Sequence, residues 1–195
     1  PVFDQLAVDA GYARMTAWCK EKPELSKQEL IEGEVRRLMA DNAKATGLKA
    51  LQGHIWKTGF ESGELQAHVY DDVIACIKNW KEQGIDVRIY SSGSIAAQKL
   101  FFGHLKDYGD QLHLFSGHYD TTIGGKKESD SYRKISQDWG LSPPEILFIS
   151  DIADELSAAA QAGLQVLASL RPGNTELPNG FAIPGIKSFE QVSLQ

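Results

Sequence analysis

The sequence predicts an α/β protein in which a small helical region precedes a doubly wound, mostly parallel sheet. Apolar residues recur every three to four positions through the first third of the chain, as in amphipathic helices. From about residue 67 onward, short apolar runs alternate with helical patterns, which favours right-handed βαβ units. We therefore expect two domains, a helical one over residues 1–66 and an α/β core over residues 67–195.

The first region is predicted to be helical throughout. Ser26 and Glu29 have the spacing of a capping box, in which each side chain satisfies a free amide of the other. A second long helix is expected over 48–60 and ends at Gly63, and a short helix is expected near the N-terminus. The helix after Ser26 carries its apolar stripe at Ile31, Val35, Leu38 and Met39.

The second region is predicted to alternate between helix and strand. Its helices are expected around Val73, Ala97, Tyr132 and Leu156, with Ser129 capping the third of them. The run 146–149 is apolar at every position, which is typical of a strand buried on both faces of a parallel sheet. The expected strands are 86–90, 112–115, 146–149, 166–170 and a last one within 183–192.

Composition and charge exclude several classes of protein. Lys and Arg number 20 against 26 Asp and Glu, so the net charge is −6, whereas a nucleic-acid-binding domain is usually basic. No apolar run reaches the length of a membrane-spanning helix, so we expect no membrane partner. Cys19 and Cys76 lack metal-ligand or disulfide spacing, which fits a reducing compartment, and we expect a cytoplasmic protein.

Polar residues follow the predicted strands at the ends where parallel sheets bind ligands. The first cluster is Ser91-Ser92-Gly93-Ser94, directly after the strand 86–90 and before a helix. Hydroxyls, a glycine and a helix N-terminus together form a cradle for an anion. The alternative is a serine-rich turn in which Ser94 is simply the N-cap of the helix.

A second cluster, Gly124-Gly125-Lys126-Lys127, precedes the helix around Tyr132. A lysine on a flexible glycine turn can reach a phosphate and neutralise it as a point charge. The alternative is a solvated surface lysine. The cluster is not a Walker motif, because the spacing of that motif is absent.

The third cluster, Ser150-Asp151, follows the apolar run 146–149. A carboxylate at the end of a buried strand is unfavourable unless it is paired or bound to a metal, and oxygen ligands suit Mg²⁺. Asp154 and Glu155 add negative charge within one turn, and the alternative role of Asp151 is the N-cap of the next helix. The three clusters together predict a phosphate and Mg²⁺ site suited to phosphoryl transfer.

The order strand–Ser, Lys, strand–Asp resembles motifs two to four of the haloacid dehalogenase-like phosphohydrolases. Within that superfamily the chain is similar, from about residue 40 to 172, to the enolase-phosphatases of methionine salvage, also called acireductone synthases. The segments that carry this similarity are LKALQGHIW (48–56), YSSGS (90–94), AQKL (97–100), SYRKI (131–135) and ILFISD (146–151).

The resemblance implies a Mg²⁺-dependent, monomeric enzyme with a Rossmann-like core and a helical cap. Such an enzyme enolises 2,3-diketo-5-methylthiopentyl 1-phosphate and then hydrolyses its phosphate ester, giving the acireductone. On this mapping Ser91 and Ser92 hold the phosphate, Lys126 neutralises it and Asp151 binds Mg²⁺. Glu155 corresponds to an acidic position of the family that supports the site from outside the metal's ligands.

One departure concerns the first motif of the family, Asp-x-Glu-Gly-Thr after an N-terminal strand, which supplies the aspartyl nucleophile. The chain contains no such motif, and neither Asp4 nor Asp9 has its surroundings. Covalent phosphoryl transfer needs that carboxylate, so we expect the chain alone not to turn over. We expect Pro1 to be an internal residue of a longer protein, in which about 30 more residues supply the first strand and nucleophile.

Three other functions are alternatives to the enolase-phosphatase interpretation. The nearest is another phosphatase of the same superfamily that acts on a small phosphorylated metabolite. A non-catalytic phosphate-binding protein would share the three clusters but release no phosphate. In a response-regulator receiver, Asp151 would be the phospho-acceptor, but the acidic pair after a first strand that such domains use is absent.

Overall fold

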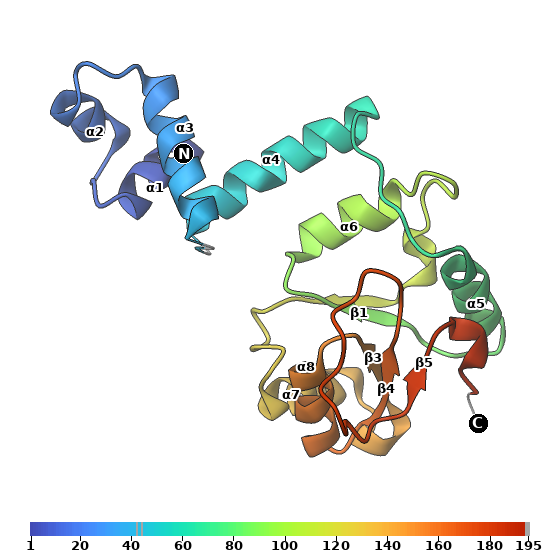
Figure 1. Cartoon of the computed structure of the whole chain (residues 1–195). Coiled ribbons are helices and arrows are strands. Elements are labelled where there is room, and N and C mark those ends of the chain that lie inside the picture. The colour runs from blue at the N-terminus through green and yellow to red at the C-terminus, as the bar shows by residue number, and fades with distance from the viewer. Residues whose placement is uncertain (42, 44, 194–195) are drawn as a thin grey trace. The chain divides into compact units, whose positions relative to one another are not determined.

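The computed structural model describes residues 1–41, 43 and 45–193, so Leu194 and Gln195 of the expected core lie outside it. The chain divides into two compact units, Pro1–Leu65 and Gln66–Gln195 (Figure 1). Within the described ranges, none of the helices combines the length and the apolar character that crossing a membrane requires.

The first unit is helical, and α1 lies at its centre. Leu6 of α1 packs in one apolar cluster and its neighbour Ala7 packs in another, so α1 is covered on two sides. A Cβ atom at Gly47 would lie 2.6 Å from the backbone nitrogen of Leu6, so glycine is required where α1 and α4 meet. The expected capping box of Ser26 is confirmed. The helices are α1 (Val2–Asp9), α2 (Met15–Glu21), α3 (Lys27–Ala40) and α4 (Thr46–Ser62).

The second unit alternates helices and parallel strands, which confirms the predicted fold class. Its helices are α5 (Asp71–Glu82), α6 (Ile95–Gly103), α7 (Ser129–Trp139) and α8 (Ala153–Gln161). Its strands are β1 (Arg88–Tyr90), β2 (Gly117–Tyr119), β3 (Leu147–Ser150), β4 (Gln165–Ser169) and β5 (Gly185–Ile186). Short 3-10 helices are η1 (Leu112–Leu114), η2 (Pro143–Glu145) and η3 (Phe189–Gln191).

The strands form two parallel sheets, β1-β2 and β3-β4-β5. Aromatic rings connect the two sheets. The ring of Tyr132, on α7, lies edge-on to Tyr90 of β1 at 5.6 Å and to Phe148 of β3 at 5.0 Å between ring centroids. Every strand pairing within the two sheets is parallel. The serine cluster follows β1, the lysine cluster comes after β2, and Ser150-Asp151 closes β3, so each cluster lies at or after the carboxyl end of a strand.

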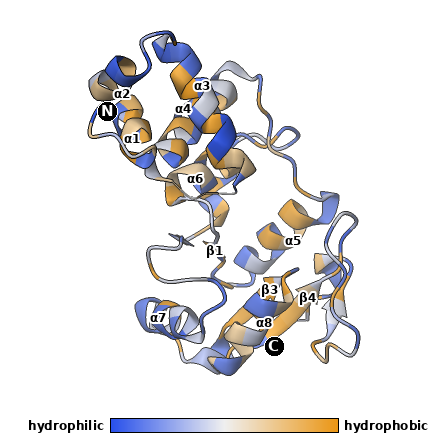
Figure 2. Ribbon diagram, turned by 60° about the vertical axis from the view of Figure 1, so that its left-hand side comes forward, coloured by the Kyte–Doolittle hydropathy of each residue, from blue (hydrophilic) through white to orange (hydrophobic). Residues whose placement is uncertain are grey.

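Helices α7 and α8 cover β3 and β4 through a small-residue core. Ala158, Ala159 and Ala162 pack against Tyr132 and Ile146, and the alanines allow the helix backbone to approach the sheet closely. β4 is drawn mainly in the orange of hydrophobic residues in Figure 2. β3 is half-buried along Leu147–Ile149 and buried at Ser150, so the expectation of a strand buried on both faces was too strong.

One predicted strand is wrong, and the last one is shorter than the segment in which it was expected. Residues 112–115 begin with the 3-10 helix η1, because the Asp110 carboxylate accepts the Leu112 amide at 2.8 Å and closes a turn there. The strand forms later, at Gly117–Tyr119, in register with β1. In 183–192 only Gly185–Ile186 is a strand, and η3 follows it. The helix around Tyr132 has Glu128 as its N-cap, and Ser129 is its first residue.

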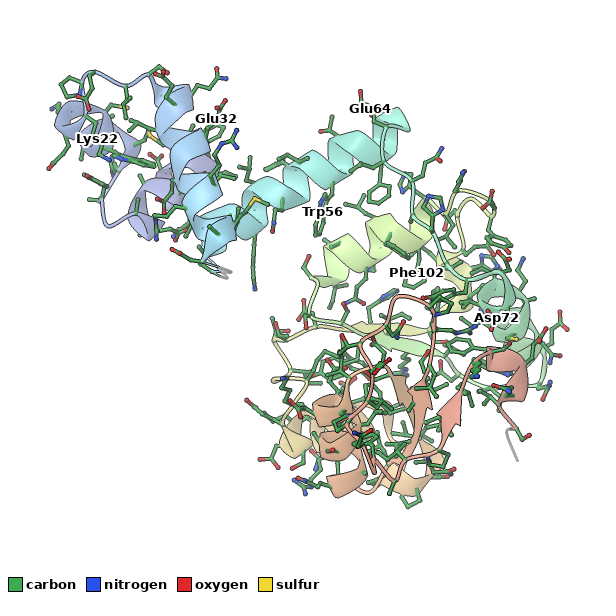
Figure 3. All side chains as sticks on the ribbon, in the orientation of Figure 1. Lys22, Glu32, Trp56, Glu64, Asp72 and Phe102 are labelled. Carbon is green, nitrogen blue, oxygen red and sulfur yellow. The ribbon has the colours of Figure 1, made fainter. Side chains whose placement is uncertain are left out.

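A buried ion pair holds the C-terminal segment against α5. Asp72, labelled in Figure 3 on α5, accepts hydrogen bonds from Arg171, from the Ser188 hydroxyl at 3.0 Å and from the Phe189 amide at 2.6 Å. The Arg171 guanidinium lies over the rings of Tyr70 and Phe189, 4.8 and 5.3 Å from their centroids. We call these residues the tail clamp.

Candidate active site

The serine loop begins where β1 ends. The Ser91 amide donates to the Tyr119 carbonyl at 3.1 Å, and the Ser91 hydroxyl accepts the Gly93 amide at 3.1 Å. Ser92 is exposed at the turn. The Ser94 hydroxyl accepts the Ala97 amide, so Ser94 is the N-cap of α6, as the alternative interpretation of this serine predicted. This leaves Ser91 and Ser92 as the predicted phosphate contacts.

A buried amide fixes the serine loop to the neighbouring strand. Gln98 of α6 donates to the carbonyl oxygens of Gly93 at 2.9 Å and Tyr119 at 2.8 Å. The Gln98 side-chain oxygen lies 3.0 Å from His118 Nδ1. An amide oxygen can only accept a hydrogen bond, so the ring proton is assigned to Nδ1. Burial lowers the pKa of His118, and nearby Lys99 lowers it further, which favours the neutral ring.

The two lysines of the glycine turn have different surroundings. Lys126 is half-buried, and its Nζ lies 2.7 Å from the Glu155 carboxylate, whose side chain is only 9% exposed. Lys127 is 67% exposed and pairs with the equally exposed Asp154 at 2.8 Å. The interpretation as a solvated surface lysine therefore describes Lys127, whereas Lys126 is held in the interior of the site.

The end of β3 supports this lysine. The Ser150 hydroxyl donates to Glu155 at 2.8 Å and accepts the Ile152 amide at 3.2 Å. The N-cap of α8 is Ile152, so the alternative role of Asp151 as N-cap is wrong. The half-buried Asp151 directly follows Ser150 at the end of the strand. Asp154 and Glu155, expected to add negative charge beside Asp151, are paired with lysines instead.

Tyr90 connects the serine loop with the glycine turn of residues 124–127, which we call the lysine loop. Tyr90 directly precedes Ser91, and the Lys126 Nζ lies 5.7 Å from the centroid of its ring. Lys126 also reaches Glu155, five residues after the end of β3. Lys126 thus lies near Tyr90, the last residue of β1, and pairs with Glu155, which binds Ser150 at the end of β3. A cation between hydroxyls and a strand-end carboxylate can neutralise and orient a phosphate group.

Sequence reasoning found the charged residues of this site and missed the residues that hold them. Gln98, Tyr90 and Tyr132 lie in segments that carry the family resemblance, but no motif spacing shows which backbone atoms they bind. Their partners are backbone carbonyls separated by 5 to 34 positions along the chain. Only the fold shows these contacts.

Gly124 adopts a backbone conformation that other residues rarely adopt, with φ at +149°. A Cβ atom there would lie 2.1 Å from the Ser131 hydroxyl. We expect Gly124→Ala to lower the free energy of unfolding by about 2 kcal/mol, because backbone strain and the clash add. At Gly125 a Cβ would meet only the flexible Glu128 carboxylate, so Gly125→Ala is the matched control. Equal denaturant midpoints for the two variants would contradict this prediction.

Comparison with known proteins agrees with the fold. The profile of a family described as haloacid dehalogenase-like hydrolase matches residues 6–163. The chain therefore belongs to the haloacid dehalogenase-like hydrolases, the class that a parallel α/β fold with these strand-end clusters predicts.

Relatives narrow this assignment. The chain is 53% identical over 167 residues to Enolase-phosphatase E1 of Aquifex aeolicus, covering 78% of this chain and 74% of that protein. It is 50% identical over 150 residues to Enolase-phosphatase E1 of Citrobacter koseri, covering 77% of this chain and 65% of that protein. Within the hydrolase class, the chain thus belongs to the Enolase-phosphatase E1 family, as the sequence resemblance predicted.

A solved structure supports the same fold. The UTR4 protein of Saccharomyces cerevisiae superposes with a TM-score of 0.77 at 39% sequence identity. The alignment covers 86% of this chain and 76% of the yeast chain. The chain spans between about two thirds and three quarters of the length of these three relatives.

Proposed function

We propose that the protein is a Mg²⁺-dependent enolase-phosphatase acting on 2,3-diketo-5-methylthiopentyl 1-phosphate in methionine salvage. The observation that carries the proposal is the position of Lys126, whose Nζ lies 5.7 Å from the ring centroid of Tyr90 and 2.7 Å from Glu155, which binds Ser150. Tyr90 and Ser150 are the last residues of β1 and β3, and Ser91 and Asp151 directly follow them. The names of the relatives at about 50% identity support the enolase and phosphatase activities.

In this proposal Ser91, Ser92 and Lys126 act on the phosphate group, and Gln98 holds the loop that carries the two serines. The hydroxyls of Ser91 and Ser92 donate to its non-bridging oxygens, and the Gln98 amide keeps their loop beside β2. Lys126 neutralises the negative charge that the group brings, which lowers the barrier to attack on phosphorus. The overall reaction shifts a proton from carbon to oxygen in the diketone, and then consumes one water to release phosphate.

The donor set at the end of β3 fits Mg²⁺ with a phosphate present. Mg²⁺ in proteins is usually held by one or two carboxylates together with water and substrate phosphate oxygens. Asp151 supplies one half-buried carboxylate, and the described residues contain no cluster of three or more His, Cys, Asp or Glu side chains that could hold a metal. When bound there, Mg²⁺ would neutralise part of the phosphate charge.

The proposal extends to the organisation of the protein. The helical unit Pro1–Leu65 would be the cap that covers the substrate, and the unit from Gln66 onward the phosphohydrolase core. The protein would act as a monomer in the cytoplasm on a small phosphorylated diketone. The molar mass of the purified protein, measured by light scattering, tests whether the protein is a monomer.

A phosphate-release assay on the whole protein tests the function. We expect release from 2,3-diketo-5-methylthiopentyl 1-phosphate with Mg²⁺, loss of release with EDTA, and at least tenfold lower kcat/KM on other small phosphate monoesters. A higher kcat/KM on another metabolite would favour the alternative phosphatase. Mg²⁺-dependent phosphate binding without release from any substrate would favour the non-catalytic protein and overturn the proposal.

A further inference from the structure

Three hydroxyl groups bind three successive backbone carbonyls of the lysine loop. One donor is on β1, and the other two are on α7, the helix that follows the loop. We call the three donors the carbonyl clasp. The pairs are Tyr90 with the Gly124 oxygen at 2.8 Å, Ser131 with the Gly125 oxygen at 2.8 Å, and Tyr132 with the Lys126 oxygen at 2.6 Å.

The donors of the clasp are fixed by their surroundings. Ser131 and Tyr132 are each 1% exposed, in the core between α7 and the sheet. The Tyr132 ring packs edge-on against both Tyr90 and Phe148, which fixes the position of its hydroxyl oxygen. Burial raises the pKa of Tyr132 and of Tyr90 above the usual value, so both hydroxyls keep their protons across the physiological range.

The loop carries no regular structure of its own at these positions. Gly124 has a φ of +149° and is followed by a second glycine. Because glycine adopts many backbone conformations, the loop does not fix its own conformation without the clasp. Lys126 is the third clasped residue, and its Nζ meets Glu155 at 2.7 Å. The direction in which its side chain leaves the loop is therefore set by the hydroxyls that hold its backbone.

We propose that Tyr90, Ser131 and Tyr132 are positioning residues, which act through the backbone of the lysine loop to hold the Lys126 ammonium at the phosphate site. This inference rests on the proposed function, since it assigns the phosphate to Lys126. A positioning role differs from a purely structural role in a measurable way. Loss of a clasp hydroxyl should weaken phosphate binding beyond any loss of stability.

Helix α7 itself supplies a matched control. Ser136 is 4% exposed and donates its hydroxyl to the Leu141 carbonyl at the opposite end of the helix. Ser131→Ala and Ser136→Ala therefore remove the same group, from the same helix, at similar burial, and each removes one hydrogen bond to a backbone carbonyl. The Gly125 carbonyl keeps the Glu128 amide at 3.1 Å in Ser131→Ala. Only Ser131 binds the lysine loop. Tyr132→Phe is a second test variant that keeps the core filled.

The experiment measures three quantities for each variant: the melting temperature, the affinity for inorganic phosphate with Mg²⁺, and amide hydrogen exchange over residues 121–128. We expect similar losses of melting temperature in Ser131→Ala and Ser136→Ala. Ser131→Ala and Tyr132→Phe should weaken phosphate binding about tenfold, the order of one buried hydrogen bond to a loop that must be ordered. Exchange of the loop should rise in both, while Ser136→Ala keeps wild-type affinity and loop exchange.

The outcomes separate the two proposals. Wild-type phosphate affinity and loop exchange in Ser131→Ala and Tyr132→Phe would overturn the positioning role and leave the proposed function intact. Equal weakening in Ser131→Ala and Ser136→Ala would overturn it as well, because the effect would follow stability alone. A wild-type protein that binds no phosphate would overturn the proposed function and this inference with it.

Discussion

Replacing Lys126 with methionine is expected to lower kcat/KM for phosphate release by at least about 100-fold, the usual effect of removing one group that stabilises transition-state charge. Methionine is an unbranched side chain one atom shorter than lysine, and it lacks both the charge and the N–H donors. Lys127→Met is the matched control, because the neighbouring lysine forms an exposed pair with Asp154. Such pairs contribute little, and we expect less than about a twofold change in activity. Steady-state kinetics on the same substrate measures both.

The same substitution should also destabilise the fold, and the two effects can be separated. Without Lys126, the buried Glu155 carboxylate retains the Ser150 hydroxyl as its one donor within the part of the chain that the structure describes. An uncompensated buried charge costs about 3 kcal/mol. Adding Glu155→Gln removes that charge. We expect the Lys126→Met/Glu155→Gln double variant to recover most of the stability while kcat/KM stays low. Recovery of activity together with stability would contradict a direct role for Lys126.

Asp72→Asn is expected to lower the free energy of unfolding by about 3 kcal/mol, because it leaves the buried Arg171 guanidinium without its counter-charge. The side chains of Arg171 and Asp72 are 7% and 13% exposed, so solvent screens the pair weakly. Asp71→Asn is the control, because Asp71 is an exposed acid in the same first turn of α5. Urea denaturation should show a loss of at most about 1 kcal/mol for the control, the size of a helix-dipole interaction.

The effect of the tail clamp should depend on pH in a defined window. Burial of Asp72 opposes its ionisation, but hydrogen bonds from Arg171, Phe189 and Ser188 outweigh burial and lower its pKa to about 2. Since this pKa is below the ordinary value of 3.8, the stabilisation is present above about pH 4 and is lost as pH falls toward 2. The pH-dependent part is about 2 kcal/mol. An unchanged difference between wild type and Asp72→Asn from pH 5 to pH 2 would contradict this assignment.

The elements that sequence periodicity predicted well are those that local residues determine. The capping box of Ser26 starts α3, and the helix predicted over 48–60 corresponds to α4 with its C-cap at Gly63. Elements that depend on distant partners were placed wrongly. The strand after α6 begins at Gly117 rather than at Leu112, because its register is set by pairing with β1. The segment after Ile186 turns into η3 where Asp72, more than 110 residues earlier, binds its backbone.

For the site, residue types at the predicted strand ends selected the three clusters, and the family resemblance selected Ser91, Ser92, Lys126 and Asp151 within them. The fold added the distinction between the two adjacent lysines. Residue type and the glycine turn alone do not distinguish Lys126 from Lys127, whereas the clasp and Glu155 contact Lys126 and the exposed Asp154 pairs with Lys127. Hydroxyl and amide donors that bind backbone atoms leave no spacing pattern, because any residue can supply the acceptor.

A crystal structure of the protein with inorganic phosphate and Mg²⁺ tests the central claim most directly. The account predicts a phosphate in contact with the Lys126 Nζ and the hydroxyls of Ser91 and Ser92, with Mg²⁺ between that phosphate and Asp151. Phosphate bound away from the ends of β1 and β3, with Lys126 still paired to Glu155 alone, would contradict it.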